Sequence, residues 1–158
     1  MAEESKPTTP DHHRQFAVDL FNHVWQLLEK KDRTREEDDE MVHAAHASCY
    51  HWGVAGTAVN LARGEWQVSR VYSVLNRPEP ALYHAKRCVE ICITNNIGDF
   101  DLAYGYEALT RALAVAGQRS DAARYVALAK QAGEKIAEKD DRDLFFSDLK
   151  SIPGYNRM

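Results

Sequence analysis

The sequence contains few cysteines and no long apolar segment. Its three cysteines, Cys49, Cys88 and Cys92, are an odd number in a chain without an export signal, which argues against a disulfide framework. No apolar run approaches the roughly 20 residues that span a bilayer. The first residues, MAEESKPTTPDHH, are acidic and polar, unlike a secretory leader. We therefore expect a cytoplasmic protein that does not cross a membrane.

The sequence also has no excess of positive charge. The net charge is −4 and the pI is about 6.0, which argues against non-specific binding to nucleic acid or to an anionic membrane. Sustained apolar–polar alternation and Asn-Gly or Asp-Gly hairpin turns are absent, so nothing indicates β-strands. A length of 158 residues suits one domain. We expect an all-α fold, with a disordered lead at residues 1–10 and a single domain at residues 11–158.

Motifs that would identify an enzyme are absent as well. The sequence has no HExxH, no Cys-x-x-Cys and no glycine-rich phosphate loop. Cys49 has His46 three residues before it, on the same helix face, but nothing indicates a third orienting group or an oxyanion hole. We therefore expect no catalytic residues and no cofactor.

A repeat is the strongest positive signal. The stretch 61–81 reads LARGEWQVSRVYSVLNRPEPA, and the stretch 102–122 reads LAYGYEALTRALAVAGQRSDA. Matching residues lie 41 positions apart, as Gly64 and Gly105 do. The same offset carried back matches Leu20 to Leu61 and Trp25 to Trp66. A fixed period of this size indicates stacked helical hairpins, because one hairpin alone cannot bury its apolar face.

Apolar residues at three- and four-residue spacing predict the helices themselves. Five are expected at about 11–31, 34–52, 58–76, 78–94 and 99–117. Thr34 and Glu37 resemble a capping box for the second, and Asp99 or Asp101 is expected to cap the fifth. A sixth opens at Ser120 or Asp121 and is closed by the charged stretch 138–143. A short seventh, at about 143–150, is expected to cap the stack.

The repeats resemble tetratricopeptide repeats. The resemblance rests on a small residue in the middle of the first helix (Ser69, Thr110), on Tyr72, and on the turn and alanine in NRPEPA and GQRSDA. It covers about 61–136. It implies a right-handed α-α superhelix of three helix-turn-helix repeats plus a C-terminal cap helix. The period of 41 departs from the family's usual 34 residues, so other α-solenoid hairpins, such as HEAT repeats, stay open.

The first helix of each unit carries a second face that is a candidate binding surface. In the family that this chain resembles, that helix lines a concave groove. Arginine offers a planar fork for carboxylates, and tryptophan offers rigid contact area. The candidate partner-binding residues are Trp25, Arg63, Trp66, Arg70, Tyr104, Glu107 and Arg111. We expect them to bind a protein or peptide segment of acidic or carboxylate character. The alternative is an internal network, in which Arg70 and Arg111 pair with Glu29 and Glu107.

A histidine cluster in HAAHASCYHW supports a second function. His43 and His46 share a helix face with Asp39, and such a set is able to hold a divalent metal. No second Glu-x-x-His pair supports the site, and the repeat matches His43 to His84 as an ordinary helix position. A metal- or small-molecule-binding regulatory protein is therefore the alternative to the interaction module. A third hypothesis is a self-associating homodimer that buries the first helix.

Overall fold

The computed structural model describes residues 8–158, and it is all-helical, as the sequence predicts. No β-strand occurs in this part of the chain. The α-helices are α1 (Thr9–Glu29), α2 (Arg35–Ala55), α3 (Ala58–Val74), α4 (Pro78–Thr94), α5 (Asp99–Val115), α6 (Arg119–Glu134) and α7 (Lys139–Lys150), and a short 3₁₀ helix, η1 (Tyr155–Arg157), follows. The predicted disordered lead falls mostly on residues 1–7, outside the described residues. Its last part is corrected, because Thr9 and Pro10 belong to α1.

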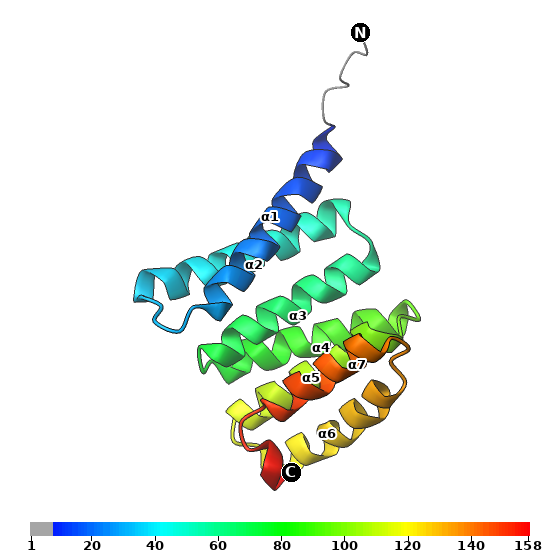
Figure 1. Cartoon of the computed structure of the whole chain (residues 1–158). Helices are drawn as coiled ribbons and strands as arrows, with labels where there is room; N and C mark the ends of the chain where they lie inside the picture. The colour runs from blue at the N-terminus through cyan, green and yellow to red at the C-terminus, as the bar shows by residue number, and fades with distance from the viewer. Residues whose placement is uncertain (1–7) are drawn as a thin grey trace.

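The helices pack as successive antiparallel neighbours. The pairs α1–α2, α3–α4 and α5–α6 form hairpins, and α2–α3 and α4–α5 join one hairpin to the next (Figure 1). The first helices of the hairpins also touch, α1 against α3 and α3 against α5. α7 turns back over the last hairpin and contacts both α5 and α6. The first helices of the hairpins and α7 therefore lie on one side of the stack.

Local sequence explains where several helices begin. The capping box predicted at Thr34 is confirmed: its hydroxyl accepts from the Glu37 N–H at 3.2 Å, and its own N–H donates to the Glu37 carboxylate at 2.9 Å. Thr8 and Thr57 cap α1 and α3 in the same way. These reciprocal bonds satisfy backbone donors that a helix start leaves free.

The predicted cap of the fifth helix is wrong, and the sixth helix begins one residue earlier than predicted. α5 follows Gly98, with no side-chain cap, and neither Asp99 nor Asp101 serves as N-cap. Asp99 adopts a left-handed φ of 52°, and its carboxylate instead accepts from the Phe100 N–H at 2.6 Å. α6 follows Gln118 rather than Ser120 or Asp121, again without a side-chain cap.

The charged stretch 138–143 does not close the sixth helix, contrary to the prediction. α6 already ends at Glu134, and Glu138 is the N-cap of α7. Asp140 and Asp141 fall in the first turn of α7, where the helix macrodipole favours negative charge. The acidic residues therefore start a helix, and α7 is four residues longer at its start than the sequence suggests.

Close helix contacts explain the two repeated glycines. A Cβ on Gly64 would lie 3.3 Å from the Cys49 Cα, and a Cβ on Gly105 would lie 2.9 Å from the Val89 side chain. Both glycines thus let the first helix of one hairpin approach the second helix of the hairpin before it. These two positions therefore need a small residue.

Two hydrophobic clusters fill the stack. One lies between α1, α2 and α3 and contains Val24, Met41 and Val68. The other extends from α3 to η1 and contains Phe145, which is fully buried. Burying a phenylalanine contributes about 1.5–3 kcal/mol, so α7 is fixed to the stack by its apolar face. Among residues 8–158, no helix is long and apolar enough to cross a membrane.

Candidate functional site

A cavity of about 580 Å³ opens between α1, α3, α5 and α7. Ligand pockets in proteins typically measure about 300–1,000 Å³. The first helix of each hairpin contributes to its walls, and α7 closes one side. The lining side chains include Phe21 and Trp25 from α1, Ala62, Arg63, Trp66 and Arg70 from α3, Phe100, Asp101 and Tyr104 from α5, and Asp141, Leu144 and Asp148 from α7.

An aromatic row crosses the cavity from one hairpin to the next. The ring centroids of Trp25 and Trp66 lie 5.6 Å apart, with their planes tilted by 34°. Trp66 and Tyr104 are also 5.6 Å apart, but nearly perpendicular at 83°. Phe100 continues the row at 4.6 Å from Tyr104. Offset and edge-to-face pairs of this kind are favourable, and they hold the rings in fixed orientations.

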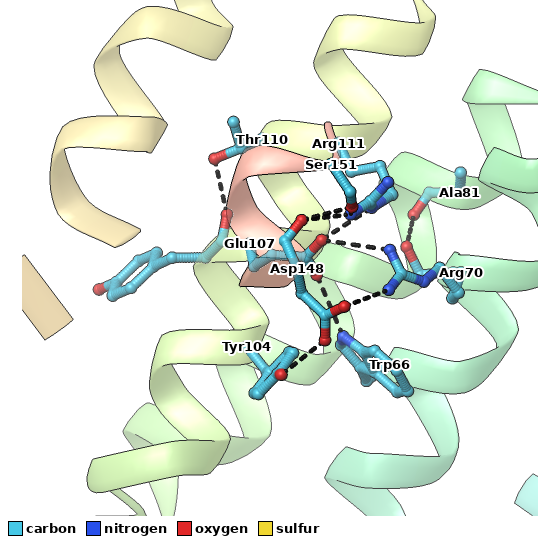
Figure 2. Close-up of polar contacts among 11 residues, drawn as sticks. Trp66, Arg70, Ala81, Tyr104, Glu107, Thr110, Arg111, Asp148 and Ser151 are labelled. Carbon is cyan, nitrogen blue, oxygen red and sulfur yellow. Dashed lines mark hydrogen bonds and ion pairs between the residues drawn. The ribbon is translucent and has the colours of Figure 1, made fainter. Parts of the chain in front are cut away.

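A buried carboxylate organises the floor of the cavity. Glu107 is 0% exposed, and its carboxylate accepts from the Arg111 Nε at 2.7 Å (Figure 2). An Arg70 guanidinium N–H and the Trp66 indole N–H each donate to the same carboxylate at 3.4 Å. Burial lowers the pKa of the Arg111 guanidinium, and the neighbouring Glu107 charge opposes that shift. The ion pair therefore stabilises the charged forms of Glu107 and Arg111 in a buried environment, where an unpaired charge would be unfavourable.

Asp148 links α7 to this network. Its carboxylate accepts from the Tyr104 hydroxyl at 2.7 Å and lies 3.7 Å from the Arg70 guanidinium (Figure 2). Arg111 donates to the Asp148 carbonyl at 3.0 Å and to the Ser151 hydroxyl at 2.8 Å. Burial, together with the bond to Asp148, raises the pKa of the Tyr104 phenol, which therefore stays a hydrogen-bond donor.

Arg63 lies nearer the solvent and has its own partner. Its side chain is 50% exposed, and it donates to the two Asp101 carboxylate oxygens at 2.7 and 3.2 Å. The hydrogen bond to Asp101 raises the pKa of Arg63. The guanidinium also lies over the Phe100 ring, 5.9 Å from its centroid. Both arginines of the cavity wall, Arg63 and Arg70, therefore already bind carboxylates of the same chain.

The structure brings the predicted binding residues together, at two depths. Five of them line the cavity: Trp25, Arg63, Trp66, Arg70 and Tyr104. The other two, Glu107 and Arg111, lie beneath it and are buried. The internal pairing expected for Arg70 and Arg111 is present through Glu107, whereas Glu29 is exposed and pairs with neither. The predicted surface is thus also part of an internal network.

Sequence reasoning missed the contribution of α7. Asp141, Leu144 and Asp148 follow the spacing i, i+3, i+7, which places them on one helix face. That spacing is visible in the sequence. The sequence pattern predicts the seventh helix only as a cap, however, and places Asp141 in the charged stretch expected to close the sixth helix. Phe100 and Asp101 were treated as part of a helix start, although Asp101 is the partner of Arg63.

His46 and His84 lie elsewhere, between α2, α3 and α4. His46 is 2.8 Å from the Tyr72 hydroxyl, and His84 is 2.6 Å from a Glu65 carboxylate oxygen. Partial burial, assisted by the charge of His84, lowers the pKa of His46. Across residues 8–158, no group of three or more His, Cys, Asp or Glu side chains converges in a way that could hold a metal. Asp39, His43 and His46 are all exposed.

The cysteines are buried and are not paired with one another. Burial raises the pKa of the Cys49 thiol to about 12, so almost none of it is thiolate at neutral pH. Cys88 and Cys92 belong to the larger hydrophobic cluster. All three cysteines therefore pack as small apolar side chains.

Comparisons with models of known protein families, with curated proteins and with solved structures give no match to this chain. The resemblance to tetratricopeptide repeats therefore stays a prediction from the sequence. The cavity and its side chains are the basis for proposing a function.

Proposed function

We propose that this protein is a non-catalytic interaction module that binds a segment of a partner protein in the cavity between α1, α3, α5 and α7. In this proposal, the three hairpins are tetratricopeptide-like repeats of a right-handed superhelix, and α7 is its cap. The observation that carries the proposal is the open cavity, which the aromatic row lines and the buried Glu107 network supports.

The regular spacing of the helices supports the repeat. α3 and α5 have the same length and begin 41 residues apart, at Ala58 and Asp99. α4 and α6 also begin 41 residues apart, at Pro78 and Arg119. Gly64 and Gly105 make equivalent close contacts with the preceding hairpin. The first hairpin departs from the pattern, because α1 and α2 are both longer.

The fixed walls of the cavity support binding. Trp66 and Tyr104 are held by packing and by hydrogen bonds to Glu107 and Asp148. A site whose side chains are already ordered loses less entropy when a ligand binds. Aromatic and arginine side chains are also those that contribute most to binding at protein interfaces. A partner segment would therefore insert a side chain with an apolar surface beside Trp25 and Leu144, which line the cavity and are not buried.

The structure changes which substitutions test this proposal. Trp66 is 9% exposed and bonded to Glu107, so Trp66→Ala perturbs the fold together with the cavity. Leu144 lines the cavity and is 53% exposed, so Leu144→Trp fills the cavity without entering the core. Leu128 is 37% exposed on α6 and does not line the cavity, so Leu128→Trp is the matched control.

The test measures binding to immobilised libraries of short degenerate peptides. We expect the wild type and Leu128→Trp to bind, and Leu144→Trp to lose binding, with all three proteins equally helical by circular dichroism. Equal binding by the wild type and Leu144→Trp, or no binding by either, would refute the proposal. An acidic segment stays an alternative partner, but its carboxylate would have to displace Asp101 from Arg63 or Asp148 from Arg70.

A small molecule is a second candidate ligand, because the volume of about 580 Å³ is that of a pocket for a compact ligand. This candidate differs from the histidine-based alternative in its location. Native mass spectrometry of protein purified from its source would detect it as a bound mass that Leu144→Trp loses. Metal binding through His43 and His46 instead predicts a stoichiometric metal that Leu144→Trp retains.

A further inference from the structure

The cavity is lined by more negatively charged than positively charged side chains. Two arginines and three aspartates line it, and each arginine is paired, Arg63 with Asp101 and Arg70 with Asp148. Asp141 is the remaining charge. It is exposed, and within residues 8–158 its side chain makes no hydrogen bond or ion pair. The charge of Asp141 helps to raise the pKa of Arg63, so the two groups interact without a direct ion pair. The lining side chains therefore carry one more negative than positive charge.

The buried network does not change this balance. Beneath the cavity, Glu107 and Arg111 form an ion pair with an N–O distance of 2.7 Å, so their two charges cancel. The carboxylates of Asp101 and Asp148 are each held by a hydrogen bond of 2.7 Å, from Arg63 and Tyr104 respectively. A ligand carboxylate would have to break one of these bonds and then face Asp141. A ligand cation would break none of these bonds, and although it would lie near Arg63 and Arg70, the excess negative charge of the lining side chains favours a positive ligand group.

The aromatic row has the chemistry to receive a cation. The faces of tryptophan, tyrosine and phenylalanine rings attract Lys and Arg side chains. The chain already uses two rings in this way: Arg70 lies 5.6 Å from the Trp66 ring centroid, and Arg63 lies over Phe100. No such cation lies over the half-buried Trp25 ring in the described part of the chain. Tyr104 has no such cation either, but it is only 6% exposed, so Trp25 is the more accessible of the two rings that could accept one.

We infer that the cavity selects a basic partner segment, binding a lysine or arginine side chain that has apolar neighbours. This inference rests on the proposed function. The stem of the basic side chain packs along Trp25 and Leu144, and its charged end lies beside Asp141. Long basic side chains bind in this manner because their methylene stems are apolar while their ends carry the charge. The apolar neighbours cover the rest of the aromatic row.

The experiment divides the peptide library by its central residue. One sublibrary each has lysine, arginine, norleucine or glutamate at that position, and all other positions are equally degenerate. Binding is measured for the wild type, for Asp141→Lys and for Asp140→Lys. Asp140 is the neighbouring exposed aspartate and does not line the cavity. The two variants therefore change the net charge equally and differ only in the position of the charge.

We expect the wild type to prefer the lysine and arginine sublibraries over norleucine. Asp141→Lys should weaken binding of the basic sublibraries by about tenfold, because it juxtaposes like charges. Asp140→Lys should weaken it by less than about threefold at physiological salt, where exposed charges are screened beyond about 8 Å. Circular dichroism and urea unfolding of both variants confirm that they are folded.

Three results would overturn the inference, and they separate it from the proposed function. A preference for glutamate that Leu144→Trp abolishes would leave the interaction module standing and refute its basic specificity. Equal loss of binding in Asp141→Lys and Asp140→Lys would show that net charge, not this cavity, selects basic peptides. Equal binding of every sublibrary by the wild type and Leu144→Trp would refute the proposed function and the inference together.

Discussion

Removing the Glu107 carboxylate should destabilise the protein strongly. In Glu107→Ala, Arg111 and Arg70 lose the carboxylate that both contact. Both arginines are largely shielded from solvent, since Arg111 is 8% exposed and the Arg70 side chain is 12% exposed. The Trp66 indole N–H loses its acceptor as well. Breaking a buried ion pair by removing one partner costs about 3–5 kcal/mol, because the other charge stays buried without compensation.

The structure places Glu107→Ala near the lower end of this range. Arg70 still lies 3.7 Å from Asp148, and Arg111 still donates to Asp148 and Ser151. We therefore expect a loss of about 3 kcal/mol in the free energy of unfolding. Glu107→Gln keeps an acceptor oxygen and the shape of the side chain, so its loss should be about 1–2 kcal/mol. Domains of this kind have a total stability of about 5–15 kcal/mol.

Urea unfolding followed by circular dichroism measures these differences. The matched control is Glu90→Ala, which removes an exposed glutamate paired with Arg87 on the same helix and should cost less than about 0.5 kcal/mol. Replacing both members of the closest pair, as in Glu107→Met with Arg111→Met, should recover at least half of the loss, because Arg111 no longer leaves a buried unpaired charge and Arg70 keeps Asp148. A loss below about 1 kcal/mol in Glu107→Ala would refute the role assigned to this carboxylate.

Further predictions concern packing, thiol chemistry and pH. Gly133→Ala should destabilise the fold by about 1–3 kcal/mol in urea unfolding, because its Cβ would overlap the Phe145 ring and displace α7. Gly117→Ala is not a suitable control, because the φ of 75° at Gly117 would add backbone strain. Cys49, whose pKa is raised to about 12, should react with a thiol reagent at pH 8 only as fast as the protein unfolds, and rapid native labelling would contradict this. Burial lowers the pKa of His46 below 6.5, so the folded state binds fewer protons than the unfolded state. The free energy of unfolding should therefore fall as the pH decreases below about 6.5. His46→Gln should make the free energy of unfolding less dependent on pH in this range. If the pH dependence is unchanged in this variant, other groups cause it.

The sequence was sufficient for the helices because their signals are local. Apolar spacing, prolines and the Thr34 capping box depend on residues only a few positions apart, and the helix positions follow them closely. The fixed offset that links Gly64 to Gly105 also indicated the helices α1, α3 and α5, which line the cavity. Local signals failed at α7, where acidic residues fit both the solvated end of one helix and the first turn of the next.

The depth and pairing of the site residues were not predictable in the same way. Trp66 and Arg63 lie three positions apart on one face, yet Trp66 is 9% exposed and the Arg63 side chain is 50% exposed. The difference arises because neighbouring helices and α7 cover only part of that face. The partner of Arg63 is 38 residues away and that of Tyr104 is 44 residues away. Contacts over such separations follow from packing, which helix periodicity does not specify.

The indole N–H signals of the three tryptophans provide the most direct test of the cavity as a binding site. Trp25 and Trp66 line the cavity, whereas Trp52 is buried outside it, beneath Arg14. A peptide from the lysine or arginine sublibrary is titrated into nitrogen-15-labelled protein, and the three side-chain signals are followed by NMR. We predict that the Trp25 and Trp66 signals shift with one common dissociation constant while Trp52 stays unchanged. A saturating shift of Trp52 without shifts of Trp25 and Trp66 would contradict the account.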